Sequence, residues 1–117
     1  MTPDPARFLP LSPAALHILL ALAAEDLHGY GIMLEIARQS AGRYKLGPGT
    51  LYDNLKKLIV HGLIEQASPR SSATDPRRRY YRLKGLGRSV LSLEVERLDG
   101  VLREARSHLR AFNPRRT

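Results

Sequence analysis

Residues 47–67, GPGTLYDNLKKLIVHGLIEQA, contain the pattern that decides the fold of this 117-residue chain. Proline is typical near a helix start and glycine directly after a helix end, so Pro48 and Gly62 predict the limits of one helix. Between them, leucine and isoleucine recur every three or four residues and give this helix one apolar face. The residues after Gly62 have the composition of a strand. The segment therefore predicts a helix that leads directly into a β-strand.

Two further helices are predicted before this segment. Ser12 and Pro13 provide an N-cap and a first-turn proline for a helix through the apolar stretch 14–24. The turn signal HGYG at 28–31 is followed by apolar residues at helical spacing, which predicts a second helix ending before Gly42. The stretch 14–24 is shorter than the roughly 20 apolar residues of a membrane span, so we expect a buried helix and no membrane partner.

After the first predicted strand, the chain returns and then forms one long helix. Residues 68–76 are rich in Ser, Pro, Thr and Asp, as in a loop, and 78–83, RRYYRL, have the composition of a return strand. Between 86 and 112, apolar residues then recur at alternating intervals of four and three, as in a coiled coil. A helix from about Leu86 to Arg110 is about 37 Å long at 1.5 Å per residue, too long for the small domain before it to cover.

A second copy of the chain is therefore the expected cover of the long helix. The alternative is a helix that folds back on its own domain. The residues predicted to form the dimer interface are Leu16, Leu91, Val95, Leu98, Leu102, Ala105 and Leu109.

This order of elements predicts a fold that is mainly α with a small β-hairpin (α+β). It is the order of a winged helix-turn-helix domain followed by a long helix. The predicted organisation is an extended N-terminal arm (1–11), a winged helix-turn-helix domain (12–84), a C-terminal dimerisation helix (85–112) and a basic tail (113–117).

The positive charge is concentrated in the middle of the chain. The sequence has 19 Lys and Arg against 11 Asp and Glu, a formal net charge of +8. Eleven of the basic residues and only three of the acidic ones lie between positions 42 and 89. Such an excess favours a polyanionic partner, because binding releases condensed counterions. We therefore expect this region to bind nucleic acid.

Two segments of the basic region are candidates for DNA contacts. The helix that begins at Pro48 holds its apolar face against the core and directs polar side chains outward. One of these is Asp53, which repels phosphate unless it accepts from cytosine or orients a lysine. The second segment is the hairpin tip, where three adjacent arginines can enter the minor groove; such a run is also typical of a solvated loop. The candidate DNA-binding residues are Thr50, Tyr52, Asn54, Lys56, Lys57, Arg77, Arg78 and Arg79.

Other classes of site have little support in the sequence. There is no cysteine, which excludes disulfides and thiolate metal sites and agrees with a cytoplasmic protein. The four histidines lie far apart, and no catalytic or phosphate-cradling motif is present, so we expect no metal, no cofactor and no enzyme activity. Tyr30 and one of Tyr80 and Tyr81 are expected to be core residues.

Several short motifs together resemble the PadR-type transcriptional regulators. They are HGYG at 28–31, PGTLY at 48–52, HGLI at 61–64, RRYYRL at 78–83 and Gly87. The resemblance spans roughly residues 11–109 and implies a cytoplasmic bacterial regulator that binds double-stranded operator DNA as a homodimer, with one C-terminal helix per subunit. The family also implies that it is a repressor.

The resemblance also implies a small-molecule inducer. Some members bind planar compounds near the dimer centre through an aromatic residue on the last helix. This chain has no tryptophan, so the candidate pocket is apolar and consists of Phe8, Leu16, Leu98 and Phe112. Two alternatives stay open from the residues alone, namely non-specific nucleic-acid binding and a winged-helix protein-interaction module.

Overall fold

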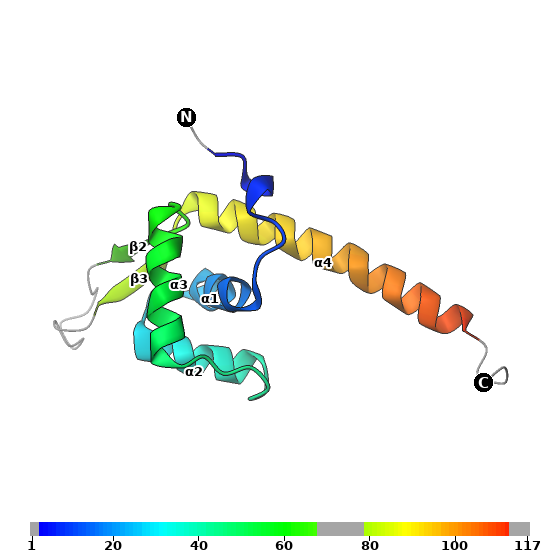
Figure 1. The fold of residues 1–117 in the computed structure, drawn as a ribbon, viewed down its shortest axis with the longest axis horizontal. Helices are drawn as coiled ribbons and strands as arrows, with labels where there is room; N and C mark the ends of the chain where they lie inside the picture. The colour runs from blue at the N-terminus through cyan, green and yellow to red at the C-terminus, as the bar shows by residue number, and fades with distance from the viewer. Residues whose placement is uncertain (1–2, 68–78, 113–117) are drawn as a thin grey trace.

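Helices dominate the structure, and three short strands lie at one end of it (Figure 1). The computed structural model describes residues 3–67 and 79–112. The predicted loop at 68–76, Arg77, Arg78 and the basic tail lie outside these residues. In chain order the elements are η1 (Pro5–Phe8, a 3-10 helix), α1 (Pro13–Ala24), β1 (Leu27–His28), α2 (Gly29–Gln39), α3 (Pro48–Val60), β2 (Ile64–Ala67), β3 (Tyr80–Leu83) and α4 (Gly85–Ala111).

The helix starts agree with the capping signals in the sequence. The hydroxyl of Ser12 accepts a hydrogen bond from the backbone N–H of Ala15 (3.1 Å), and Pro13 is the first residue of α1. α3 begins at Pro48, and Gly62 follows its end with a φ of +78°, a left-handed value that glycine adopts without strain. The mainly α fold with a small antiparallel sheet is confirmed.

Two local predictions were incomplete. The N-terminal arm is not simply extended, because Asp4 accepts a hydrogen bond from the N–H of Ala6 (3.0 Å) and begins the one-turn helix η1. The short strand β1 was not predicted at all. Two residues cannot show the alternation by which a strand is detected in a sequence, and β1 exists only through its pairing with β3.

The sheet has the order β1-β3-β2, and both pairings are antiparallel. Leu27 pairs with Tyr81 across β1 and β3, and Gln66 pairs with Tyr81 on the other side. Tyr81 is buried at this centre, as expected for one of the two adjacent tyrosines. Arg82 on the same strand donates to the carboxylate of Asp26 (3.1 Å), which ties the sheet to the end of α1. Because β1 leads directly into α2, the pairing of β1 with β3 fixes the position at which α2 begins.

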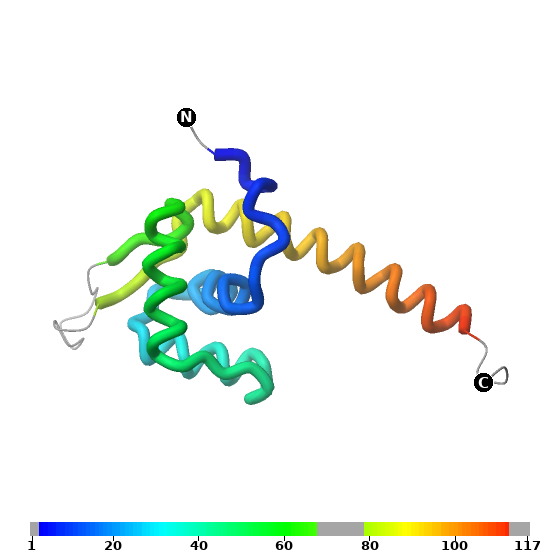
Figure 2. Tube along the Cα trace, viewed as in Figure 1, coloured from blue at the N-terminus to red at the C-terminus, as the bar shows by residue number. Residues whose placement is uncertain are grey.

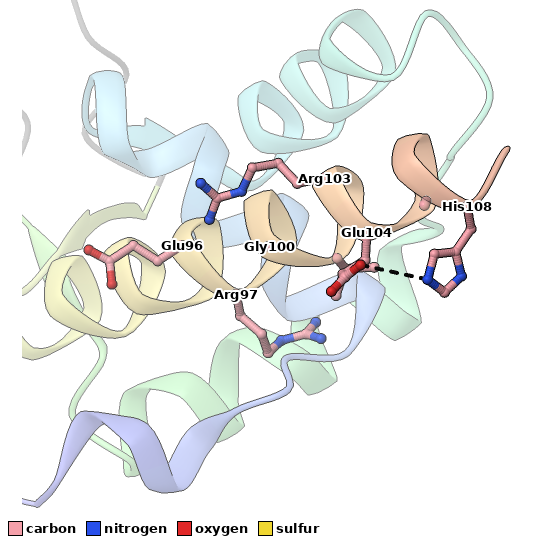
Figure 3. A pocket seen from close by; sticks show the side chains of 8 residues that line it. Glu96, Arg97, Gly100, Arg103, Glu104 and His108 are labelled. Atoms are coloured by element: carbon pink, nitrogen blue, oxygen red, sulfur yellow. Dashed lines mark ion pairs between the residues drawn. The ribbon is translucent and has the colours of Figure 1, made fainter. Parts of the chain in front are cut away.

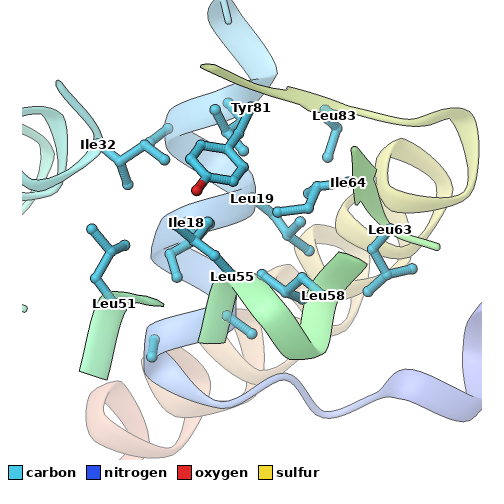
Figure 4. Packing of buried hydrophobic residues seen from close by; sticks show 14 of the residues in the cluster. Ile18, Leu19, Ile32, Leu51, Leu55, Leu58, Leu63, Ile64, Tyr81 and Leu83 are labelled. Carbon is cyan, nitrogen blue, oxygen red and sulfur yellow. The ribbon is translucent and has the colours of Figure 1, made fainter. Parts of the chain in front are cut away.

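The core forms around α1. Figure 4 shows Ile18 and Leu19 of α1 between side chains of α3, β2 and β3. The apolar circumference of α1, expected to need cover on several sides, is buried against α2, α3, α4 and the sheet. The labelled residues of the cluster in Figure 4 are Ile18, Leu19, Ile32, Leu51, Leu55, Leu58, Leu63, Ile64, Tyr81 and Leu83.

α4 packs on this core only with its first turns. Gly87, Val90, Leu91 and Glu94 are buried, whereas every residue from 101 to 112 is exposed. At Gly87 the helix crosses the chain so closely that a Cβ atom would collide with the backbone carbonyl oxygen of Leu63. The far half of α4 therefore projects beyond the domain, as Figure 1 shows, and the structure extends over 62 × 37 × 23 Å.

Glu94 is the only charged residue among the buried residues of the described chain, with 1% of its surface exposed. Its Oε2 accepts a hydrogen bond from the backbone N–H of Leu11 (2.9 Å), and Arg97 pairs with both carboxylate oxygens. The hydrogen bonds from Arg97 lower the pKa of Glu94, although burial acts in the opposite direction, and the Leu11 N–H adds to the lowering. The carboxylate therefore holds the N-terminal arm on α4.

Within the described residues, no helix combines the length and the apolar character that a membrane span requires.

Gly87→Ala should lower the free energy of unfolding by about 1–3 kcal/mol, because the added methyl group forces α4 away from the backbone of Leu63. Urea unfolding measures this change. Gly85→Ala is the matched control, since it lies in the same helical turn and an added Cβ atom there would meet only open space. Equal stability of the two variants would contradict the close packing at Gly87.

Glu94 should make the stability depend on pH. Its folded-state pKa lies below the ordinary value of 4.5, so its stabilisation is fully present above that value and is lost as the pH falls through the folded-state pKa. We expect Glu94→Gln to be less stable than the original chain at pH 7, and this difference to shrink below pH 4.5. Thermal unfolding between pH 3 and pH 7 measures the difference, and a pH-independent difference would contradict the assignment.

Candidate nucleic-acid interface

α3 presents one apolar and one polar face. Leu51, Leu55 and Leu58 are buried against α1, while Thr50, Asp53, Lys56 and Lys57 on other sides of the helix are exposed. The trace in Figure 2 places α3 and the strands at the end of the molecule away from the projecting part of α4. A basic helix surface is therefore available at that end. The structure brings Thr50, Lys56 and Lys57 to it together, as the sequence predicted.

Tyr52 lies where α2 and α3 meet. Its ring packs so closely on Gly29, at the start of α2, that a Cβ atom at that position would collide with the phenol hydroxyl. Half of the side-chain surface stays exposed. Burial raises the pKa of Tyr81, and the nearby Tyr52 raises it further. Tyr52 thus aligns the two helices, and the DNA contact expected of it stays a prediction.

Asn54 is engaged within its own helix. Its side-chain amide donates a hydrogen bond to the backbone carbonyl of Thr50 (2.8 Å), and the residue is half-buried. Bidentate recognition of adenine needs one amide N–H and the amide oxygen, and the bond to Thr50 leaves both of these groups available. The contact of Asn54 with a DNA base stays a prediction.

Of the three arginines predicted at the hairpin tip, one lies in the described part of the chain. Arg79 is exposed directly before β3, and its charge acts on the phenol of Tyr81. Arg77 and Arg78, the other two predicted wing residues, lie outside the described residues. A cation thus lies at the loop end of the hairpin strands, next to the pair formed by Ala67 and Tyr80.

The HGYG motif has a structural meaning that the sequence reading missed. His28 is the N-cap of α2, where its Nδ1 accepts a hydrogen bond from the N–H of Gly31 (3.0 Å), and its ring meets Tyr80 edge to face at 5.3 Å. The prediction that Tyr30 is a core residue was wrong, because its side chain is 58% exposed. Ile32 and Ile36 fill the buried face of α2 instead, and Tyr30 points outward from its first turn.

The predicted seam of α4 divides into two parts. Leu91 is buried within its own protomer, where it belongs to the core, and Leu16 on α1 is half-buried against the same core. Beyond them the seam is uncovered, from Leu98, which is 36% exposed, to Leu109, which is 75% exposed. The exposed seam residues are Val95, Leu98, Leu102, Ala105 and Leu109.

The four residues of the candidate inducer pocket do not come together within one chain. The ring of Phe8 meets His61 at the end of α3 (5.6 Å between centroids), whereas Phe112 lies directly after the last residue of α4. α4 alone carries a shallow depression around Gly100, lined by charged side chains that include Arg97, Glu104 and His108 (Figure 3). His108 pairs there with Glu104 at 3.7 Å. An apolar pocket is not formed at this place.

No group of three or more His, Asp or Glu residues that could hold a metal ion occurs in the described part of the chain. The described residues show three surface features: a basic face on α3, an arginine at the loop end of the hairpin strands and an exposed apolar stripe on α4.

Comparison with known proteins identifies the family. The family model described as "Transcriptional regulator PadR-like family" matches residues 18–93. Transcriptional regulator Rv3488 of Mycobacterium tuberculosis is 34% identical over 89 residues, which cover 76% of this chain and 78% of that protein. Residues 18–93, which the family model matches, contain α2, α3 and the strands β1, β2 and β3.

Solved structures show the same fold. A PadR family transcription regulator from Clostridium difficile is 26% identical, with a TM-score of 0.68 over 84% of this chain and 99% of that chain. Bacillus subtilis PadR, solved in complex with operator DNA, is 23% identical, with a TM-score of 0.59 over 71% of this chain and 46% of that chain. The chain therefore belongs to the PadR-like family of transcriptional regulators, which are DNA-binding proteins and not enzymes.

Proposed function

We propose that this regulator binds a pseudo-palindromic operator as a homodimer and represses transcription by occupying that operator. The observation that carries the proposal is the exposed basic face of α3 at one end of an elongated protomer whose uncovered apolar helix extends away from it. In a dimer of helix-turn-helix domains the two recognition helices enter successive major grooves about 34 Å apart. The operator DNA seen with Bacillus subtilis PadR supports the same mode for this fold.

The shape of α4 supports the homodimer. On the first turns of the helix, Val90, Leu91 and Glu94 face the core. One turn further on, the same side of the helix continues with Leu98, Val101 and Leu102, which nothing in the protomer covers. Burial of apolar surface stabilises by roughly 25 cal/mol per Å², so a second α4 is the natural cover for this stripe. Of the predicted interface residues, Leu91 is buried in its own protomer, so the proposed interface consists of the exposed seam together with the half-buried Leu16.

Regulation by an inducer is part of the proposal. A small apolar or aromatic compound would bind between α1 and the two final helices, and it must favour a dimer geometry that does not fit the operator. Phe8 belongs to η1 and packs on His61 at the end of α3, whereas Phe112 follows the far end of α4, so a pocket with Phe8, Leu16, Leu98 and Phe112 requires residues from both protomers. The proposed place of action is the bacterial cytoplasm, together with the DNA.

Lys57→Ala should weaken operator binding, because the variant loses a phosphate contact. The slope of log Kd against log salt should also fall by about 0.9. Fluorescence anisotropy with duplexes selected from a random pool measures both quantities. Arg106→Ala is the control, since it removes one exposed cation from the projecting part of α4. If the two variants bind alike at every salt concentration, α3 is not the DNA-contacting helix.

Competition with random duplex DNA distinguishes an operator-specific regulator from a protein that coats nucleic acid. A repressor should prefer its selected site by a factor of about 10³ or more over random sequence. A ratio near one would support the alternative of non-specific binding.

Leu102→Lys should shift the protein from dimer to monomer, because a charge in the middle of the exposed stripe cannot be buried against a second helix without a partner. Sedimentation equilibrium measures the association. Ser107→Lys introduces the same side chain on the opposite side of α4 and should leave the dimer intact. A chain that is monomeric before any substitution would favour the protein-interaction alternative.

A further inference from the structure

The carboxylate of Glu94 joins two parts of the chain that are 83 residues apart in sequence. It accepts from the N–H of Leu11 on the arm and pairs with Arg97 on its own helix. A buried ion pair is weak support for stability, since well-packed apolar residues often replace one without loss. An apolar side chain at position 94 would serve the core equally well but would not hold the arm. The contact is therefore better explained by a role in fixing the position of the arm relative to α4.

The arm that Glu94 holds also touches the end of the recognition helix. Phe8 meets the ring of His61 edge to face at 5.6 Å. His61 is the C-cap of α3, and its backbone N–H donates to the carbonyl of Lys57 (3.0 Å). Residues 8–11 thus connect the end of α3, through Phe8 and His61, with the first half of α4, through Leu11 and Glu94, and Figure 1 shows the arm crossing α4 there.

Besides the core packing of Val90 and Leu91, two further contacts anchor α4. The first is Gly87, which rests on the backbone of Leu63, and the second is Glu94, which is bound to Leu11. Seven residues separate the two anchors, about 10 Å along the helix, and roughly 26 Å of helix project beyond the second one. Since about 36 Å of helix lie beyond Gly87, a tilt of about 10° about that residue would move the far end of α4 by about 6 Å.

We propose that Glu94 is a positioning residue for DNA recognition, which acts through the N-terminal arm to fix the direction of α4 relative to α3. The inference rests on the proposed homodimer, in which this direction sets the separation of the two recognition helices. Glu94 itself touches no DNA. Loss of its charge removes the ion pair with Arg97 and weakens the hold on the arm, so α4 can tilt about Gly87 while each recognition helix stays intact.

The test compares binding to a full operator with binding to a single half-site. The probes are a duplex selected by the original protein, the same duplex with one half-site scrambled, and duplexes whose central spacer is longer or shorter by one base pair. Glu94→Gln is the principal variant. Asp99→Asn is the matched control, because it neutralises an exposed carboxylate on the same helix, paired with Arg103 at 3.6 Å.

We expect Glu94→Gln to bind the half-site within about twofold of the original protein but to lose about tenfold of the advantage of the full operator, since two linked sites gain affinity only when their spacing fits. It should also discriminate less between spacer lengths. Asp99→Asn should change neither quantity. A merely structural defect would lower half-site and full-site binding together, and this outcome would overturn the proposal.

Circular dichroism and sedimentation verify that the variant is folded and dimeric. If Glu94→Gln does not fold, Phe8→Ala, which removes the other contact of the arm, carries the same expectation. A folded variant with an unchanged full-site advantage and spacer preference refutes the positioning role while the homodimer stands. If the original protein shows no advantage for two half-sites, the proposed function fails, and the positioning role fails with it.

Discussion

The close crossing of α4 over the backbone of Leu63, made possible by Gly87, is the contact on which the arrangement of the molecule depends. Leu63 stands between the end of α3 and the start of β2, and its carbonyl also accepts the N–H of Lys84 (3.0 Å). This one short segment therefore connects α3 to β2 and also supports the start of α4. A side chain at Gly87 would separate these three elements, whatever their own propensities.

Two surfaces of opposite character follow from this crossing. The exposed face of α3 is polar and basic, while the exposed part of α4 is apolar on one side for several turns. They lie toward different ends of the molecule (Figure 1). A partner that covers α4 therefore leaves α3 free to meet DNA. The buried carboxylate of Glu94 lies between the two surfaces and ties the arm to the helix that links them.

The family motifs are explained by contacts between them. Gly29 of HGYG lacks the Cβ atom that would collide with Tyr52 of PGTLY, so the two motifs hold α2 against α3. His28 caps α2 and packs on Tyr80 of the return strand. A residue of such a motif thus need not touch DNA to matter for binding. Tyr30, which the motif also contains, is left outward and available.

The sequence by itself determined the helices, the hairpin strands, the basic region and the family, because caps, periodicity and charge are local properties that chain order preserves. Tertiary structure alone decided the pairing of β1, the outward position of Tyr30, the burial of Leu91 within its own protomer and the separation of Phe8 from Phe112. It also decided the burial of Glu94, which reads in the sequence as one of several charges along a helix. The physical reason is that each of these depends on which distant segment packs against a residue, and a contact across 83 residues leaves no periodic signal in the chain.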